Sequence, residues 1–173
     1  MSTNDTVLLL ANGGSAALVV DDTSEAFFFD AVHVVCHALA DMIVSDGEGI
    51  TRVVEVRVEK AVDEEDAEKV ARAIGNSLLV KSSWFGSDPN WGRLVDAAGY
   101  SGAALEENRL DILYDEIPAM INGQPQHDRK PEWKDVVSRP RFLITVRLNL
   151  GSGRFRILAS DLTDEYVIFN RSE

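Results

Sequence analysis

The sequence predicts an α+β fold: a layered α/β sandwich with a mixed or antiparallel sheet and a C-terminal β-hairpin. Segments with helical periodicity and segments with alternating apolar residues follow one another without a strict βαβ rhythm, which favours this class. The last third has the clearest strand pattern, because "RFLITVRLNL" alternates and "GSG" predicts an antiparallel turn into "RFRILAS". With 173 residues, 45% of them hydrophobic, the chain is long enough to form a single unit, 1–173, around one core.

The N-terminal part predicts a strand and a long helix. "TVLLLA", residues 6–11, is a continuous apolar run before "NGG" and predicts a buried strand followed by a turn. In "AFFFDAVHVVCHALADMIV" the polar residues recur at three- and four-residue steps and form one stripe: Asp30, His33, His37 and Asp41. The stripe favours a buried amphipathic helix over a membrane span. Asp22, with Glu25 three residues later, predicts a capping box at its start.

The middle of the chain predicts further elements in alternation. "RVVEVRVEK" predicts a half-buried strand, and "VDEEDAEKVARAIGN" predicts a helix whose apolar face holds Ala67, Val70, Ala71 and Ile74. Glu65 with Lys69 and Glu68 with Arg72 form ion pairs one turn apart. "RLDILYDE" predicts a strand, "INGQPQHDRKPEWKD" a loop, and "YVIFN" a short final strand.

The stretch "LVKSSWFGSDPNWGRLVDAAGYSG", residues 79–102, is locally unusual. Ser87 or Asp88 is predicted to cap a helix that begins at Pro89. Gly92 inside this helix predicts a close approach of another group to its backbone, since glycine weakens helices. The pattern favours a packing junction, with the wall of a ligand site as the alternative.

Composition limits the functions that the chain can have. The net charge of −12 argues against nucleic acid and anionic membranes as partners. Cys36 is the one cysteine, which excludes an intramolecular disulfide, and its apolar surroundings predict an inert core thiol. No basic segment precedes the first apolar run, so we expect no secretory signal and a cytoplasmic location.

Three groups of residues are candidates for chemistry. Glu48, between two glycines in "SDGEG", has the character of a general base, although a solvated turn residue is the simpler interpretation. The arginines of the last third can attract a carboxylate, but a solvated sheet face matched to acidic neighbours is favoured: Arg141, Arg147, Arg154 and Arg156. His33 and His37 lack a third metal ligand, so we expect neither a metal nor a cofactor.

Four motifs in order carry a resemblance that extends from Ser2 to Asn170: "STNDTVLLLANG", "SDGEG", "LVKSSWFGSDPNWGR" with "GYSG", and "SDLTDEYVIFN". The chain resembles the bifunctional glutamate N-acetyltransferase/ornithine acetyltransferase family of arginine biosynthesis. The resemblance implies a precursor that cuts itself before a threonine into α and β chains, which assemble as an α2β2 heterotetramer. It also implies that this threonine passes an acetyl group from N-acetylornithine to glutamate, and that some members use acetyl-coenzyme A as well.

The resemblance also implies roles for particular residues. Glu48 matches a glutamate that contacts substrate, which overturns the simpler interpretation of this residue, and Asn170 matches an asparagine that binds substrate. The "DPNWGR" stretch matches a hallmark without a direct catalytic role and is expected to build the packing around the site. Thr3 and Thr6 belong to the strand motif and cannot replace the nucleophile, and "FNRSE" stops short of the family's usual ending.

We therefore expect the β-chain portion of such an enzyme, with no catalytic residue of its own and inactive without an α chain that supplies the nucleophile segment and the oxyanion hole. The alternative is a catalytically dead homologue that acts as a binding or assembly subunit. Either way, apolar surface that awaits a partner is expected to be exposed.

Overall fold

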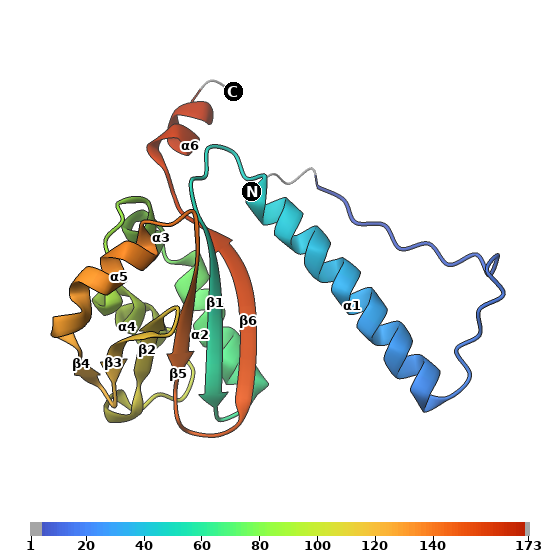
Figure 1. Ribbon diagram of the computed structural model, residues 1–173, viewed down its shortest axis with the longest axis horizontal. Coiled ribbons are helices and arrows are strands. Elements are labelled where there is room, and N and C mark those ends of the chain that lie inside the picture. Colours follow the sequence, from blue (N-terminus) through green and yellow to red (C-terminus); the bar gives the residue numbers. More distant parts are fainter. Residues whose placement is uncertain (1–4, 172–173) are drawn as a thin grey trace. The chain divides into compact units, whose positions relative to one another are not determined.

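The computed structural model describes residues 5–171 and is shown in Figure 1. The chain divides into two compact units, one up to Gly47 and one from Glu48 onward. We describe each unit separately. The prediction that residues 1–173 form a single unit stays a prediction.

The first unit contains one long helix, α1 (Asp22–Ser45). A capping box is present, but it is formed by Asp21 and Ser24, one residue earlier than predicted. The Asp21 carboxylate accepts a hydrogen bond from the Ser24 amide at 2.7 Å, and the Ser24 hydroxyl accepts one from the Asp21 amide at 3.1 Å. The Ser24 amide holds the pKa of Asp21 below its usual value. A hydroxyl that bonds back to the cap thus takes the place that the sequence pattern assigned to Glu25.

The apolar residues of the first unit are exposed, contrary to the prediction of a buried strand and a buried helix. Residues 6–11 are extended but form no strand, because a strand needs a hydrogen-bonded neighbour. Among the 24 residues of α1 that the structure describes, Val44 is the buried one. Large side chains along the helix stay exposed, among them Phe27, Phe28, Phe29, Val34, Val35 and Met42. By length and composition α1 could cross a membrane, but a core helix of a soluble protein meets the same two criteria.

Within the described residues, the second unit is built on a six-stranded sheet with the order β4-β3-β2-β5-β1-β6 (Figure 1). Its strands are β1 (Val53–Ala61), β2 (Asp111–Tyr114), β3 (Ile117–Ile121), β4 (Gln124–Pro125), β5 (Arg141–Arg147) and β6 (Gly153–Ser160). The pair β1–β5 is parallel and the other pairs are antiparallel, so the predicted mixed sheet of an α+β fold is confirmed.

The predicted C-terminal hairpin is wrong in its pairing. β5 and β6 run in opposite directions, as expected, but β1 lies between them: Val56 is aligned with Ile144 of β5 and with Ile157 of β6. The connection crosses the end of β1, where the Leu150 amide donates to the Lys60 carbonyl oxygen at 2.9 Å. Gly153 lies against the residues that follow β1, since a Cβ at Gly153 would lie 2.0 Å from the Asp63 carbonyl oxygen. The glycines of "GSG" therefore allow the connection to pass close to the backbone at the end of β1, rather than to form a tight turn.

The helices of the second unit are α2 (Glu64–Asn76), α3 (Leu78–Phe85), α4 (Trp91–Gly99), α5 (Lys130–Val137) and α6 (Asp164–Phe169), with short 3-10 turns η1 (Glu107–Arg109) and η2 (His127–Arg129). The prediction of α2 is confirmed, together with its buried face and its ion pairs, Lys69–Glu65 at 3.0 Å and Arg72–Glu68 at 2.7 Å.

Four local predictions for this unit are corrected. The pattern did not predict α3. The expected loop "INGQPQHDRKPEWKD" contains the last residue of β3, all of β4 and most of α5, and the expected strand "YVIFN" lies mostly in α6. The predicted helix begins at Trp91 instead of Pro89, because Asn90 is the cap and its side-chain oxygen accepts from the Arg93 amide at 3.2 Å.

The core lies on one face of the sheet, the face that carries Val54, Val56 and Val58. Trp84 of α3 packs edge-on against Phe142, and Trp133 of α5 packs against Tyr114, whose pKa is raised by burial. Charged residues alternate with the buried ones along β1 and therefore point to the opposite face. Helices thus cover one face of this sheet, and the turns between elements are left at its ends.

Candidate functional site

The candidate site lies at the end of the sheet where β1 begins and β6 ends. Because these two strands are antiparallel, Val53 lies opposite Ser160. The loop that contains Glu48 and the segment that leads through α6 to Asn170 therefore emerge side by side (Figure 1). Antiparallel pairing thus brings the segments that carry these two candidates to the same end of the sheet, although the candidates are more than a hundred residues apart in the sequence.

Two buried side chains join these segments. The Asp161 carboxylate accepts hydrogen bonds from the Thr51 amide at 3.0 Å, the Arg52 amide at 3.1 Å and the Thr51 hydroxyl. The Thr163 hydroxyl donates to the Gly49 carbonyl oxygen at 2.8 Å. Asp161 and Thr163 are only 3% and 2% exposed, so these bonds are shielded from competing water. The Glu48 loop is therefore fixed at several points to the segment after β6.

Glu48 and Asn170 occupy different environments within this arrangement. Glu48 is half-buried, whereas Asn170 is exposed at the end of α6, where its side-chain amide donates to the Tyr166 carbonyl oxygen at 2.7 Å. Gly49 has φ +63°, and a Cβ there would lie 3.1 Å from the Tyr166 nitrogen. The loop next to Glu48 is thus packed against the first turn of α6. The roles of Glu48 and Asn170 in substrate binding stay predictions.

Arg52 extends this network to the helices. Its guanidinium donates to the Phe85 carbonyl oxygen at 3.0 Å and to the Ser87 hydroxyl at 2.7 Å, and its Nε donates to the Val137 carbonyl oxygen at 3.0 Å. It lies 3.6 Å from the Asp161 carboxylate, and the Arg52 side chain is 12% exposed. Asp161 and Arg52 were not among the predicted site residues, because nothing in the local sequence distinguishes them from surface charges next to a strand.

The stretch 79–102 forms a packing junction beside this network. The Asn90 amide group donates to the Asp88 carboxylate at 2.9 Å, and the Arg93 guanidinium donates to the Leu79 carbonyl oxygen at 2.6 Å. The predicted close approach at Gly92 is wrong, since a Cβ there would meet the Asn90 side chain at an ordinary 3.5 Å. The junction borders the candidate site through Ser87.

Lys81 lies at the same end of the sheet. Its ammonium donates to the Ser160 carbonyl oxygen at 2.5 Å, and burial lowers its pKa. Its backbone carbonyl accepts from the Leu162 amide at 3.4 Å. Lys81 therefore attaches α3 to the segment that contains Asp161 and Thr163.

The other predicted candidates lie outside this site. Two of the four arginines form ion pairs on the solvated sheet face, as the favoured interpretation predicted. The Arg147 guanidinium lies 3.1 Å from the Glu59 carboxylate, and the Arg156 guanidinium lies 3.7 Å from the Glu55 carboxylate. His33 and His37 are in contact through their Nε2 atoms at 3.0 Å, but among residues 5–171 no group of three or more metal-ligating side chains occurs.

Three further candidates belong to the N-terminal part. Cys36 is exposed, which corrects the prediction of a core thiol. Thr3 lies outside the described residues, and Thr6 is exposed in the extended segment.

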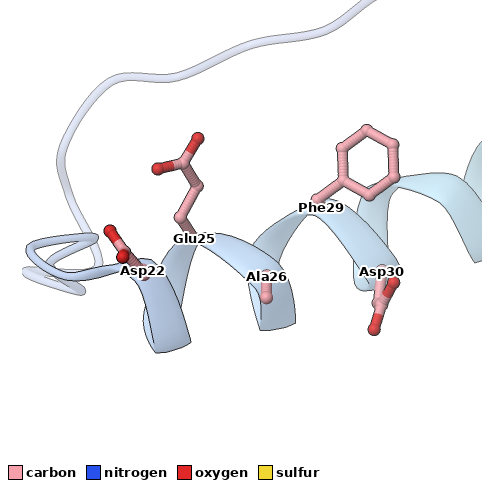
Figure 2. A pocket seen from close by; sticks show the side chains of 5 residues that line it. All are labelled: Asp22, Glu25, Ala26, Phe29 and Asp30. Carbon is pink, nitrogen blue, oxygen red and sulfur yellow. The ribbon is translucent and has the colours of Figure 1, made fainter.

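Figure 2 shows the side chains that line an open hollow on α1, all from this one helix: Asp22, Glu25, Ala26, Phe29 and Asp30. An open hollow of this kind offers no convergent polar groups for a ligand.

The described elements and the joined loops define an α+β domain built on a six-stranded mixed sheet. A crystal structure of the arginine biosynthesis bifunctional protein ArgJ from Bacillus halodurans matches it with a TM-score of 0.92 and 33% identity, over 100% of this chain and 83% of that chain. The ArgJ family profile matches residues 1–172. The chain belongs to the ArgJ family, which confirms the resemblance.

Curated relatives agree with this assignment. The arginine biosynthesis bifunctional protein ArgJ of Chlorobium chlorochromatii is 42% identical over 171 residues, which are 99% of this chain and 40% of that protein. The glutamate N-acetyltransferase of Methanocaldococcus jannaschii is 42% identical over 177 residues, or 98% and 44% of the two chains. The chain thus spans about two fifths of the length of the curated relatives that it matches.

Proposed function

We propose that this chain is the β-chain portion of an ornithine acetyltransferase/glutamate N-acetyltransferase. The complete enzyme moves an acetyl group from N-acetylornithine to glutamate through an acetyl-threonine. The observation that carries the proposal is the joining of the Glu48 loop to the Asn170 segment by Asp161 and Thr163 in a member of the ArgJ family. Two polar side chains held at one end of a sheet are suited to orient an amino-acid substrate.

Each candidate side chain has a chemical task in this proposal. The Glu48 carboxylate accepts a proton from the α-ammonium of glutamate, so that the free amine attacks the acetyl carbonyl of the acetyl-threonine. The ester bond to the threonine then breaks, and the threonine oxygen takes up the second proton that the nitrogen loses, which releases N-acetylglutamate and the free threonine hydroxyl. The Asn170 side chain has both a donor and an acceptor for the polar groups of the amino acid. We assign the threonine nucleophile and the oxyanion-hole donors to the part of the relatives that these 173 residues do not match.

The exposed apolar surface of the first unit supports the proposal that this chain binds a partner chain. Leu8, Leu9 and Leu10 are 78%, 80% and 89% exposed, and the phenylalanines of α1 are exposed as well. Monomeric soluble proteins rarely expose large apolar patches. We assign this surface to contact with an α chain of the same precursor in an α2β2 heterotetramer. We further propose a cytoplasmic location and no need for a cofactor, a nucleic acid or a membrane.

A chimera tests the proposed function. The matching two fifths of the C. chlorochromatii relative are replaced by this chain, and the release of ornithine from N-acetylornithine is measured with glutamate present. We expect turnover by the chimera and none by the isolated chain. Glu48→Gln lowers kcat by about 10²-fold or more, as expected for loss of an acid–base group. Glu106→Gln, on an exposed side chain paired with Arg109, is the matched control.

The alternative is a catalytically dead binding or assembly subunit, which the exposed apolar surface of the first unit equally supports. A folded chimera that transfers no acetyl group, while the unaltered relative does, would favour this alternative. Turnover by the isolated chain would contradict the assignment of the nucleophile to another segment.

A further inference from the structure

The Asp161 carboxylate is a buried charge that the proposed chemistry does not use. Its side chain has no exposed surface, and it receives three hydrogen bonds from Thr51 and Arg52. A buried carboxylate is costly unless such donors are present. All three donors belong to the residues just after the Glu48 loop, and the Arg52 guanidinium lies 3.6 Å from the carboxylate, so this charge is compensated next to the loop.

The Arg52 guanidinium lies where two helices end. Phe85 is the last residue of α3 and Val137 is the last residue of α5, and both carbonyl oxygens accept hydrogen bonds from Arg52. The last carbonyls of a helix lack partners within the helix and carry its partial negative charge, which favours a cation. Arg52 therefore ties the start of β1 to the ends of two helices that pack on the core.

The third donation of Arg52 reaches the stretch 79–102. Ser87 has φ +51°, a left-handed conformation that is unfavourable for a residue with a side chain, and its hydroxyl accepts from Arg52 at 2.7 Å. The bond thus helps to hold a strained turn in place. The "FGSDPN" segment therefore anchors Arg52 through Phe85 and Ser87.

We propose that Asp161 and Arg52 are positioning residues for the acetyl transfer. Neither is assigned a contact with substrate. Asp161 holds the loop that carries Glu48, and its own segment continues through the Thr163–Gly49 bond and α6 to Asn170. Arg52 connects this pair of segments to the frame of α3 and α5. This inference rests on the proposed function, because it deepens the role of the same site.

Amide hydrogen exchange on this chain tests the positioning directly. Asp161→Asn removes the charge at nearly constant shape, and Arg52→Lys keeps the charge but loses the planar fork of donors. We expect exchange at the Thr51 and Arg52 amides and in residues 164–170 to become about 10-fold faster or more, while exchange at buried Val70 of α2 is unchanged. Asp111→Asn is the matched control, since Asp111 is also buried but accepts from Asn122 and Asn149 at the opposite end of the sheet. Unchanged exchange in both segments, or an equal increase everywhere, overturns the proposal.

Kinetics of the chimera separate positioning from general stability. Asp161→Asn is expected to lower kcat/KM by about 10- to 100-fold, because a misplacement of about 1 Å costs that much. In the Glu48→Gln background the same change is expected to cost less than about 3-fold, since residues that act through one another are not additive. Equal losses in both backgrounds would overturn the proposal. If the unaltered chimera transfers no acetyl group, the proposed function fails, and the exchange experiment still decides whether Asp161 anchors the loop.

Discussion

The hydroxyl of Thr163 donates a hydrogen bond to the carbonyl oxygen of Gly49 at 2.8 Å, and the two residues are 114 positions apart in the sequence. The same hydroxyl accepts from the Tyr166 amide at 3.1 Å and caps α6. One buried side chain therefore starts the last helix and holds the loop that carries Glu48. The same oxygen atom therefore contributes to the order of both segments.

Thr163→Ala removes both of these bonds. We expect it to lower the free energy of unfolding by about 1–2 kcal/mol, the usual cost of losing a helix cap. Thr163→Ser keeps the hydroxyl and should restore most of that loss. Urea unfolding followed by circular dichroism measures both variants. Equal stabilities of the alanine and serine variants would show that the hydroxyl does not hold this junction.

Gly153→Ala tests the crossing of the C-terminal connection over β1. The added Cβ would lie 2.0 Å from the Asp63 carbonyl oxygen, so backbone has to move. We expect a loss of about 1–3 kcal/mol in the free energy of unfolding. Gly92→Ala in α4 is the control, since its Cβ makes only an ordinary contact, and it should gain about 0.5–1 kcal/mol from helix propensity. Comparable effects at the two glycines, measured by thermal unfolding, would contradict this packing.

Asp66 gives the chain a specific dependence on acid. The Ala104 amide, at 3.0 Å, and Lys69 hold the pKa of Asp66 below its usual value of 3.8. A lowered pKa means that the stabilisation is complete above 3.8 and is lost as pH falls through the lower folded value. Asp66→Asn should therefore be less stable than the parent chain at pH 7, and the difference should shrink below pH 3.8. Urea midpoints at several pH values measure it, and a difference that grows in acid would refute the assignment.

Phe28 and Trp84 test the contrast between the two units. Phe28 is 56% exposed, whereas Trp84 is 1% exposed in the core of the second unit. Phe28→Ser should change the free energy of unfolding by less than about 0.5 kcal/mol and reduce the binding of a hydrophobic dye. Trp84→Ala should cost about 3–5 kcal/mol. A large loss of stability in Phe28→Ser would mean that this side chain is already packed in the isolated chain.

Local patterns were sufficient for much of the second unit. Alternation predicted β1, β2 and β5, and the apolar stripe of α2 predicted which of its residues are buried. These predictions succeeded because each pattern is repeated over several residues and reflects burial of one face. The motifs around Glu48 and Asn170 identified the family for the same reason, since they are short and contiguous.

The failures share a different origin. "LVKSSWF" has no helical stripe, yet it forms α3, because the Ser77 hydroxyl caps it and Trp84 packs against Phe142. The exposed run 6–11 has the composition of a strand but pairs with no strand among residues 5–171. In both places the outcome depends on what lies beside the segment, which composition does not contain.

The site itself depends on contacts between distant residues. The pattern of β5 and β6 predicted two antiparallel strands, but the insertion of β1 between them, which places Glu48 beside α6, arises from pairing across most of the chain. The bonds of Asp161 to Thr51 and of Arg52 to Ser87 join residues 110 and 35 positions apart. Most of the secondary structure and the family thus follow from local sequence, because propensity and side-chain periodicity act over a few residues. Strand order and the network at the site follow from packing and burial, which act only once the chain has folded.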